Sequence, residues 1–122
     1  MKNGIDVSVD GTKEWWANGQ LHREDGPAIE HAGGSRIWCQ NDKIHREDGP
    51  AYEESDGTRV WYIYDVRHRE DGPAVEFANG TKMWYIKGVR LTLDEFIKRT
   101  KKKKFTADEI ESLQSYNIQV DS

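Results

Sequence analysis

The sequence has a single cysteine, Cys39, in 122 residues. One cysteine cannot form an internal disulfide bond, and it cannot supply the several thiolates of a cysteine-based zinc site. Apolar runs are short, and none approaches the roughly 20 residues of a membrane-spanning helix. The first residues, MKNGIDVSVD, lack the apolar stretch of a secretory signal peptide. These absences predict a soluble protein of a reducing compartment, in the bacterial-type cytoplasm, or in the host cytoplasm if the chain is phage-encoded.

Apolar residues are also scarce, at 35% of the chain, whereas charged residues reach 33%. Five Trp and five Tyr nevertheless argue against disorder. This balance favours one small domain of elongated or single-layer form, in which wide aromatic rings are half-buried.

The net charge of −4 comes from the first three quarters of the chain. Residues 1–91 hold 12 Lys and Arg against 16 Asp and Glu, and residues 92–122 hold 6 of each. An acidic repeat region argues against nucleic acid and against a membrane surface as partners. Lys101–Lys104 form the one basic run. We interpret it as a solvated helix end, with nucleic acid or anionic lipid as the open alternative.

All three prolines and three of the four histidines lie in one heptapeptide, HREDGPA, which begins at His22, His45 and His68. The spacing is 23 residues, and a Gly and a Trp recur at the same period. A fourth copy starts at Gly80 but has no HREDGPA. The repeats lie near residues 11–33, 34–56 and 57–79, with a partial copy at 80–92.

Each repeat carries hairpin signals, because Gly33-Gly34, Asp56-Gly57 and Asn79-Gly80 suit two-residue turns between runs of strand-forming residues. Two strands per unit are expected in a shared sheet. Such turns predict a specific set of cross-strand pairs. These are Ile29 with Trp38, Tyr52 with Trp61, Val75 with Trp84, and Glu54 with Arg59.

The unit W-Y-x-x-G-x-x-H-R-E-D-G-P-A resembles a variant of the MORN repeat that occurs in bacterial and tailed-phage proteins. The resemblance covers about residues 11–92, and it departs from the MORN pattern where HREDGPA replaces the H-G-x-G step. It implies a mainly β fold, an open antiparallel β-meander. By analogy it also implies a phage-type modulator or inhibitor of a host or defence protein.

The remaining chain, 93–122, predicts a two-helix cap on the repeat region 1–92. Thr92 with Glu95 and Thr106 with Glu109 have capping-box spacing. We expect helices at about 93–103 and 107–115, which cover the apolar end of the last hairpin.

His, Arg, Glu and Asp in one motif suggest an active site, yet the motif repeats without a unique nucleophile. Equivalent histidines at a pitch of roughly 10 Å cannot share one metal ion. We therefore predict no catalytic residue, metal or cofactor, and a structural repeat motif. Independent anion sites remain the alternative for these loops. The structural motif comprises His22, His45, His68, Asp25, Asp48, Asp71, Trp15, Trp38, Trp61 and Trp84.

The residues next to the Trp column suggest a binding surface. Trp16, Tyr62, Tyr64 and Tyr85 are expected to project from the face opposite the core, where aromatic side chains favour protein partners. The sequence thus predicts a non-enzymatic protein-binding repeat module. The alternative is a protein that sequesters a small anion or nucleotide, with Arg46 and Arg69 (and Arg23) as its cationic groups.

Overall fold

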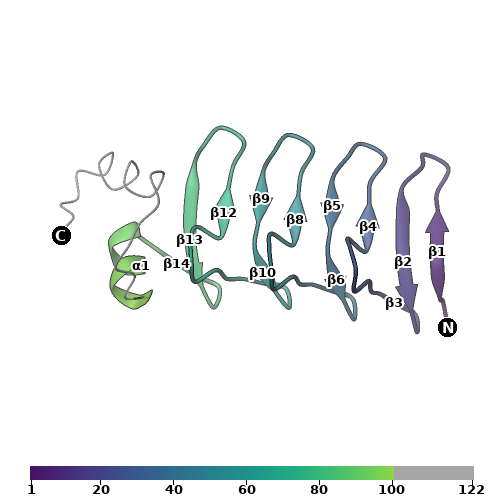
Figure 1. Ribbon diagram of the computed structural model, residues 1–122, viewed down its shortest axis with the longest axis horizontal. Coiled ribbons are helices and arrows are strands. Elements are labelled where there is room, and N and C mark those ends of the chain that lie inside the picture. Colours follow the sequence, from purple (N-terminus) through teal and green to yellow (C-terminus); the bar gives the residue numbers. More distant parts are fainter. Residues whose placement is uncertain (101–122) are drawn as a thin grey trace.

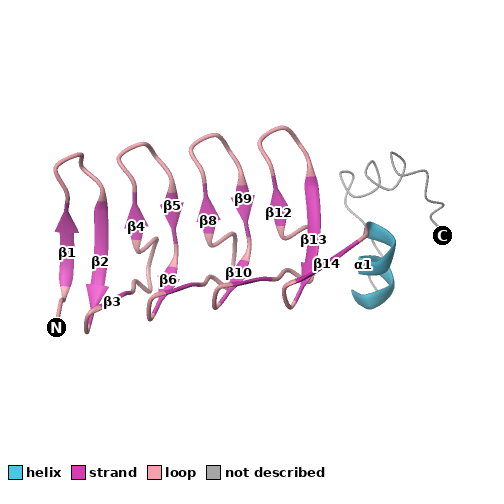
Figure 2. Ribbon diagram, turned by 180° about the vertical axis from the view of Figure 1, so that it is seen from behind, coloured by secondary structure: helices cyan, strands magenta, loops and turns pink. Residues whose placement is uncertain are grey.

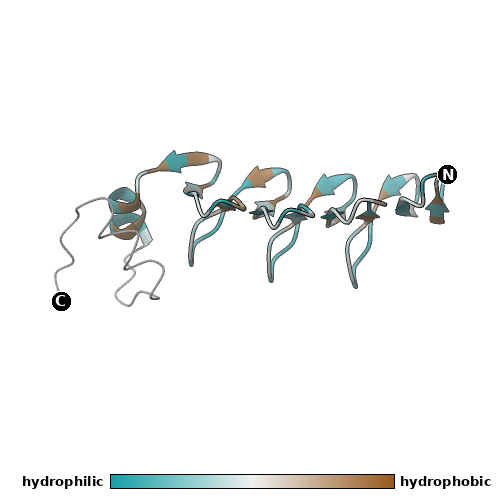
Figure 3. Ribbon diagram, turned by 90° about the horizontal axis from the view of Figure 1, so that it is seen from above, coloured by the Kyte–Doolittle hydropathy of each residue, from teal (hydrophilic) through white to brown (hydrophobic). Residues whose placement is uncertain are grey.

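The structure is a computed structural model that describes residues 1–100. Hairpins stand side by side in a row, and one helix lies at the end of the row (Figure 1). The view from behind places the N-terminal hairpin and the helix at opposite ends (Figure 2). From above, the hairpins also follow one another in a single row (Figure 3). The expected mainly β, antiparallel meander is confirmed.

Ten strands form the long antiparallel sheet, and four more form two separate hairpins. Along the sheet lie β1 (Gly4–Val7), β2 (Lys13–Ala17), β4 (Ile29–Glu30), β5 (Arg36–Ile37), β8 (Tyr52–Glu53), β9 (Arg59–Val60), β12 (Val75–Glu76), β13 (Lys82–Ile86) and β14 (Val89–Leu91), while β3 (Gln20–Leu21) pairs with β2. The separate hairpins are β6 (Cys39–Gln40) with β7 (Lys43–Ile44), and β10 (Tyr62–Ile63) with β11 (Val66–Arg67). A complete unit thus adds two strands to the long sheet and a small hairpin beside it.

The loops at the tips of the long-sheet hairpins contain three residues, so the expected two-residue turns are wrong. Between β12 and β13 the loop is Ala78-Asn79-Gly80, closed by a hydrogen bond from Phe77 N to Thr81 O of 2.9 Å. Gly80 has φ +91°, a left-handed conformation that follows the turn and that glycine adopts without strain. The Asn79 side chain fixes the turn by accepting a hydrogen bond from Thr81 N (2.9 Å).

One extra loop residue shifts the register by one, so the expected cross-strand partners of the tryptophans are also wrong. Val75 lies opposite Met83, and Glu53, not Glu54, lies opposite Arg59. The same register places apolar side chains on one face of the sheet. They are Ile29, Ile37, Tyr52, Val60, Val75 and Met83.

The opposite face carries charges of alternating sign across successive strands. The series is Lys13, Glu30, Arg36, Glu53, Arg59, Glu76 and Lys82. Arg36 pairs with Glu53 at 2.6 Å, and Arg59 pairs with Glu76 at 3.1 Å. Opposite charges across strands contribute about 0.2–1 kcal/mol per pair, so this ladder helps to fix the register.

The small hairpins have two-residue turns in which both residues have positive φ, as in type I′ turns. In the second of them the turn residues are Tyr64 (φ +42°) and Asp65 (φ +67°). The Asp65 side chain accepts a hydrogen bond from Ile44 N, in the preceding unit, at 2.7 Å. These turns therefore join neighbouring units as well as reversing the chain.

The row ends at α1 (Leu93–Thr100), which packs on β13 and β14. Thr92 and Glu95 form the expected capping box: Glu95 N donates to Thr92 Oγ1 (3.1 Å), and Thr92 N donates to Glu95 Oε1 (2.9 Å). This backbone hydrogen bond lowers the pKa of Glu95. The start of the first helix agrees with the sequence. The second predicted helix, 107–115, and Lys101–Lys104 lie outside the described residues.

A small apolar core joins the helix to the last hairpin. Its buried members are Trp84, Ile86, Leu91, Leu93 and Phe96. The Phe96 ring is fully buried, and its centroid is 6.4 Å from that of Trp84. None of the helices within residues 1–100 has the length and apolar character needed to cross a bilayer.

We expect Phe96→Ala to destabilise the fold by about 3–5 kcal/mol, because it removes a fully buried ring from this core. The free energy of unfolding from urea denaturation measures the effect. Lys98→Ala, an exposed change on the same helix, is the control and should stay within about 0.5 kcal/mol of the parent. If Phe96→Ala unfolds at the parent's urea concentration, α1 does not stabilise the end of the sheet.

Candidate functional site

In each HREDGPA loop the Arg side chain stacks on the Trp of its own unit. The Cζ atom lies 3.9 Å from the Trp15 ring centroid in Arg23, 4.1 Å from that of Trp38 in Arg46, and 3.9 Å from that of Trp61 in Arg69. A guanidinium group over an indole ring is a favourable cation–π arrangement. It covers a ring that a single-layer sheet cannot bury between two layers.

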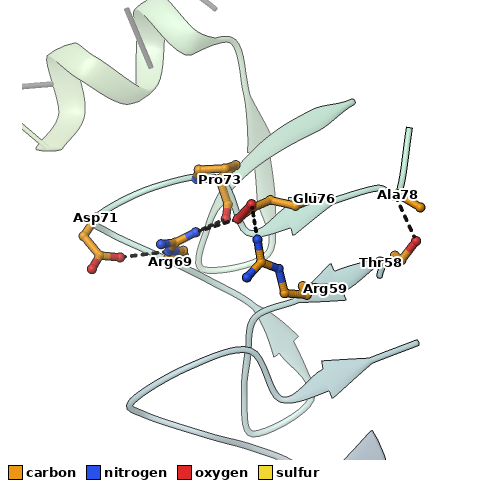
Figure 4. Close-up of polar contacts among 7 residues, drawn as sticks. All are labelled: Thr58, Arg59, Arg69, Asp71, Pro73, Glu76 and Ala78. Carbon is orange, nitrogen blue, oxygen red and sulfur yellow. Dashed lines mark hydrogen bonds and ion pairs between the residues drawn. The ribbon is translucent and has the colours of Figure 1, made fainter. Parts of the chain in front are cut away.

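The same guanidinium group is held at its edge by oxygen atoms (Figure 4). Arg69 Nε donates to Asp71 Oδ1 at 2.9 Å, and its terminal nitrogen donates to Pro73 O at 3.0 Å and to Glu76 at 3.2 Å. Glu76 also accepts from Arg59, so the loop is joined to the charge ladder. The other two copies repeat these contacts.

The glycine and alanine of the motif follow from this packing. A Cβ atom on Gly49 would lie 2.8 Å from Arg46 Cζ, so a side chain at this position requires the guanidinium group to move off its place on Trp38. Ala51 is fully buried, and its carbonyl accepts a hydrogen bond from Trp38 N, in the same unit, at 2.7 Å. The Asp and Trp residues that were predicted to be structural are thus held together by contacts with the Arg of the same loop.

The histidines join successive units through Nδ1. This atom accepts a backbone N–H from the small-hairpin turn of the next unit: from Asn41 to His22 (3.2 Å), from Tyr64 to His45 (3.1 Å) and from Lys87 to His68 (2.8 Å). An imidazole that accepts at Nδ1 carries its proton on Nε2. Nε2 of His45 lies 3.7 Å from Glu47 Oε1, beyond hydrogen-bond length.

The Glu and the Asp of each motif both project into solvent, but only the Asp is paired with the Arg of the loop. The exposed fraction of the side chain is 84% for Glu24, 82% for Glu47 and 74% for Glu70. None of the three forms an ion pair with Lys or Arg within the described residues. Sequence reasoning missed them, because a motif that repeats as a block does not reveal which of its members is free.

Two clefts lie between successive HREDGPA loops. The first, of about 720 Å³, is lined by Glu24, Glu47, Trp38, His45 and Tyr64, among others. The second, of about 600 Å³, is lined by the corresponding Glu47, Glu70, Trp61 and His68. The clefts and their bordering loops are called the loop surface below.

The predicted aromatic patch is divided between two faces. Tyr64 borders the first cleft, with its ring stacked on His45 at a centroid distance of 3.9 Å. Tyr62 instead lines a shallow hollow of about 260 Å³ on the apolar sheet face. Arg67 lies over the Tyr85 ring at 5.4 Å and is paired across the small hairpin with Tyr62, so Tyr85 lies on the same side as Tyr62. Trp16 stands in the first unit, half-buried beside Lys2. The four residues therefore do not form one continuous surface.

The predicted anion-binding residues, Arg46 and Arg69, belong to the internal network. Each guanidinium group is bonded to two carboxylates and a carbonyl oxygen. Within residues 1–100, no three His, Cys, Asp or Glu side chains stand close enough together to hold a metal ion.

Cys39 is buried in β6 at the position where the neighbouring units have Trp16 and Tyr62. Burial, and then the nearby carboxylates of Asp65 and Asp42, raise its pKa from 9.0 to about 11. The group is therefore a protonated thiol at neutral pH.

Comparison of the chain with protein-family models, with curated proteins and with solved structures finds no match. The likeness to the MORN repeat therefore rests on the sequence pattern, and the site is interpreted from its own geometry.

We expect Gly49→Ala to cost about 1–3 kcal/mol of stability, because the added methyl group displaces the Arg46 side chain from Trp38. In the Arg46→Ala background the same change should cost almost nothing, since the clash is gone. Urea denaturation of the two single variants and the double variant gives the coupling free energy. Additive effects would contradict the packing of Arg46 against Gly49.

We expect slow alkylation of Cys39 in the folded protein at pH 8, and fast alkylation in urea, because only the thiolate reacts. Iodoacetamide labelling followed by mass spectrometry measures both rates. The folded pKa lies above the unfolded value, so the stability it contributes is present below about pH 9 and is lost as the pH rises toward 11. Equal labelling rates with and without urea would contradict the buried thiol.

Proposed function

We propose that the protein is a non-enzymatic protein-binding repeat module and that the loop surface contacts the partner. The observation that carries this proposal is that some side chains of HREDGPA are bonded within the array whereas the Glu side chain is not. His and Arg make contacts inside the array, and the exposed Asp is paired with Arg. Glu24, Glu47 and Glu70 also face solvent, at the borders of two clefts, but have no Lys or Arg partner within residues 1–100. A regular row of unpaired charges beside clefts is a feature that the fold itself does not require.

The engagement of His and Arg favours binding over catalysis. A general base needs a free nitrogen lone pair, and Nδ1 of each motif histidine already accepts a backbone N–H. Each guanidinium group likewise donates from Nε and Nη1 to two carboxylates and a carbonyl oxygen, and these carboxylates argue against the alternative of a small-anion or nucleotide-binding protein. A bound phosphate would lie close to the carboxylates already paired with each arginine and would be repelled by them.

Tyr64 supports the choice of the loop surface over the apolar sheet face. It is 51% exposed and holds a φ of +42°, a conformation that costs a bulky residue energy. The equivalent turns have Asn18, Asn41 and Lys87, so the repeat does not demand an aromatic ring there. Exposed Tyr residues at the edge of a cleft are typical anchors of protein interfaces. The narrower expectation of a phage-type modulator of a host or defence protein rests on the MORN-like resemblance.

We expect the partner that the protein captures from host lysate to be lost with Tyr64→Ala, at a cost of about 2 kcal/mol of binding free energy. Affinity capture with quantitative mass spectrometry, followed by calorimetry on the purified partner, measures the loss. Phe77→Ala is the matched control, because Phe77 is an exposed aromatic residue beside the sheet-face hollow. Loss of binding with Phe77→Ala and retention with Tyr64→Ala would move the interface to the sheet face.

A further inference from the structure

We propose that the loop surface binds an extended protein segment with a basic residue at every third position. This inference rests on the proposed protein-binding function and specifies the chemistry of the partner. It is carried by three independent features of the clefts: their charge, an unused hydrogen-bond donor, and the pitch of the array.

Each cleft has an excess of negative charge. The first is lined by two guanidinium groups and four carboxylates, and the second has the same composition. The arginines are already paired with Asp and with the strand Glu of their own unit. The Glu of each motif remains, and Glu47 borders both clefts. A Lys or Arg side chain is the protein group that complements such a site.

The second feature indicates a peptide rather than a simple cation. The side chain of His45 is only 8% exposed and lines the first cleft. Because Nδ1 accepts the Tyr64 N–H, the Nε2 atom carries a proton, and it makes no hydrogen bond within the described residues. The nearest carboxylate oxygen, Glu47 Oε1, is 3.7 Å away, so a backbone carbonyl oxygen from a bound segment in the cleft can accept this N–H. A metal ion or polyamine offers no such acceptor.

The third feature sets the spacing. Each unit adds two strands to the long sheet, so equivalent loops recur at roughly 10 Å. A polyproline II segment has three residues per turn and rises about 3.1 Å per residue, so every third side chain returns to the same face after about 9.3 Å. Its backbone makes no internal hydrogen bonds, which leaves its carbonyls free for the histidines. The pitch of the array and the pitch of this conformation therefore match.

The rings of Trp38 and Tyr64 give the first cleft apolar walls. Such walls suit the aliphatic stem of a Lys or Arg residue and the ring of a proline. The second cleft has Ile63 where the first has Gln40, so both offer contact area, with different polarity.

Three synthetic peptides of equal length test the proposal by fluorescence anisotropy. One repeats Lys-Pro-Ala, the second has the same composition with its lysines gathered at one end, and the third has Glu in place of every Lys. We expect the spaced peptide to bind at least about tenfold more tightly than the gathered one, because it engages both clefts together. Its affinity should fall as salt is raised, and the Glu peptide should not bind.

Variants locate the binding on the protein. Glu47→Gln should weaken the spaced peptide about fivefold, and Glu24→Gln, Glu47→Gln and Glu70→Gln combined should abolish its binding. Glu54→Gln removes an equal charge from an exposed tip loop and should leave the affinity unchanged. Thermal melting of each variant shows that the fold is retained, since the three motif Glu side chains make no hydrogen bond to the array.

Equal affinity for the spaced and gathered peptides, or full affinity in the triple variant, would overturn the proposal. If no basic peptide binds and a partner is still captured in a Tyr64-dependent manner, this inference fails and the protein-binding function stands. If neither is observed, both fail.

Discussion

The stacking of Arg on Trp is the interaction on which the rest of this structure depends. A one-layer sheet has no interior in which an indole ring can be buried, so each ring of the first three units needs a cover supplied by its own loop. Arg provides it at 3.9–4.1 Å. Once the guanidinium group lies there, its charge and donors need partners, which fixes Asp, the Pro carbonyl and the strand Glu. A side chain at the following Gly would push the guanidinium group off the ring. Four of the seven motif positions, Arg, Asp, Gly and Pro, therefore take part in this contact or follow from it.

The last unit shows what happens where that contact is missing. Trp84 has no HREDGPA loop after it, and the helix α1 occupies the corresponding role. Phe96 replaces the guanidinium group as the cover of the ring, so an apolar core stands in place of a charged network. The exchange has a cost, because Trp84 Nε1 is buried without a hydrogen-bond partner in the described chain. At the end of the array an apolar helix therefore covers the Trp ring in place of an Arg loop. This contact explains why the helix packs on the last hairpin.

The repeat, the meander and the start of the helix were predictable, because each leaves a periodic or local signal in the sequence. The strand register was not predictable, because Asn-Gly and Asp-Gly suit both two-residue and three-residue loops. A difference of one loop residue shifts the pairing by one and moves every side chain to the other face of the sheet. The turn at Tyr64 and Asp65 was missed because neither residue is a glycine. The site was predictable only in part. Its members stood out as a motif, but whether Arg46 or Glu47 faces solvent depends on packing, which the motif alone does not encode.

In this repeat, the residues that fix the spacing of the loops are different from the residues that distinguish one cleft from the next. The contacts of His, Arg, Asp, Gly and Ala recur with nearly the same distances, so the pitch of the loop surface is fixed by the fold. Variation between units can then change what each cleft recognises without disturbing that pitch. Tyr64 and Gln40 give the first cleft an aromatic and an amide group, whereas the second has Ile63. Gln40 is itself anchored to Arg23 O at 3.1 Å, so even this variable position is oriented by the invariant loop. Under the proposed function, recognition depends on the side chains that differ between clefts at a constant spacing, and the exposed Glu is the constant group without a Lys or Arg partner in residues 1–100.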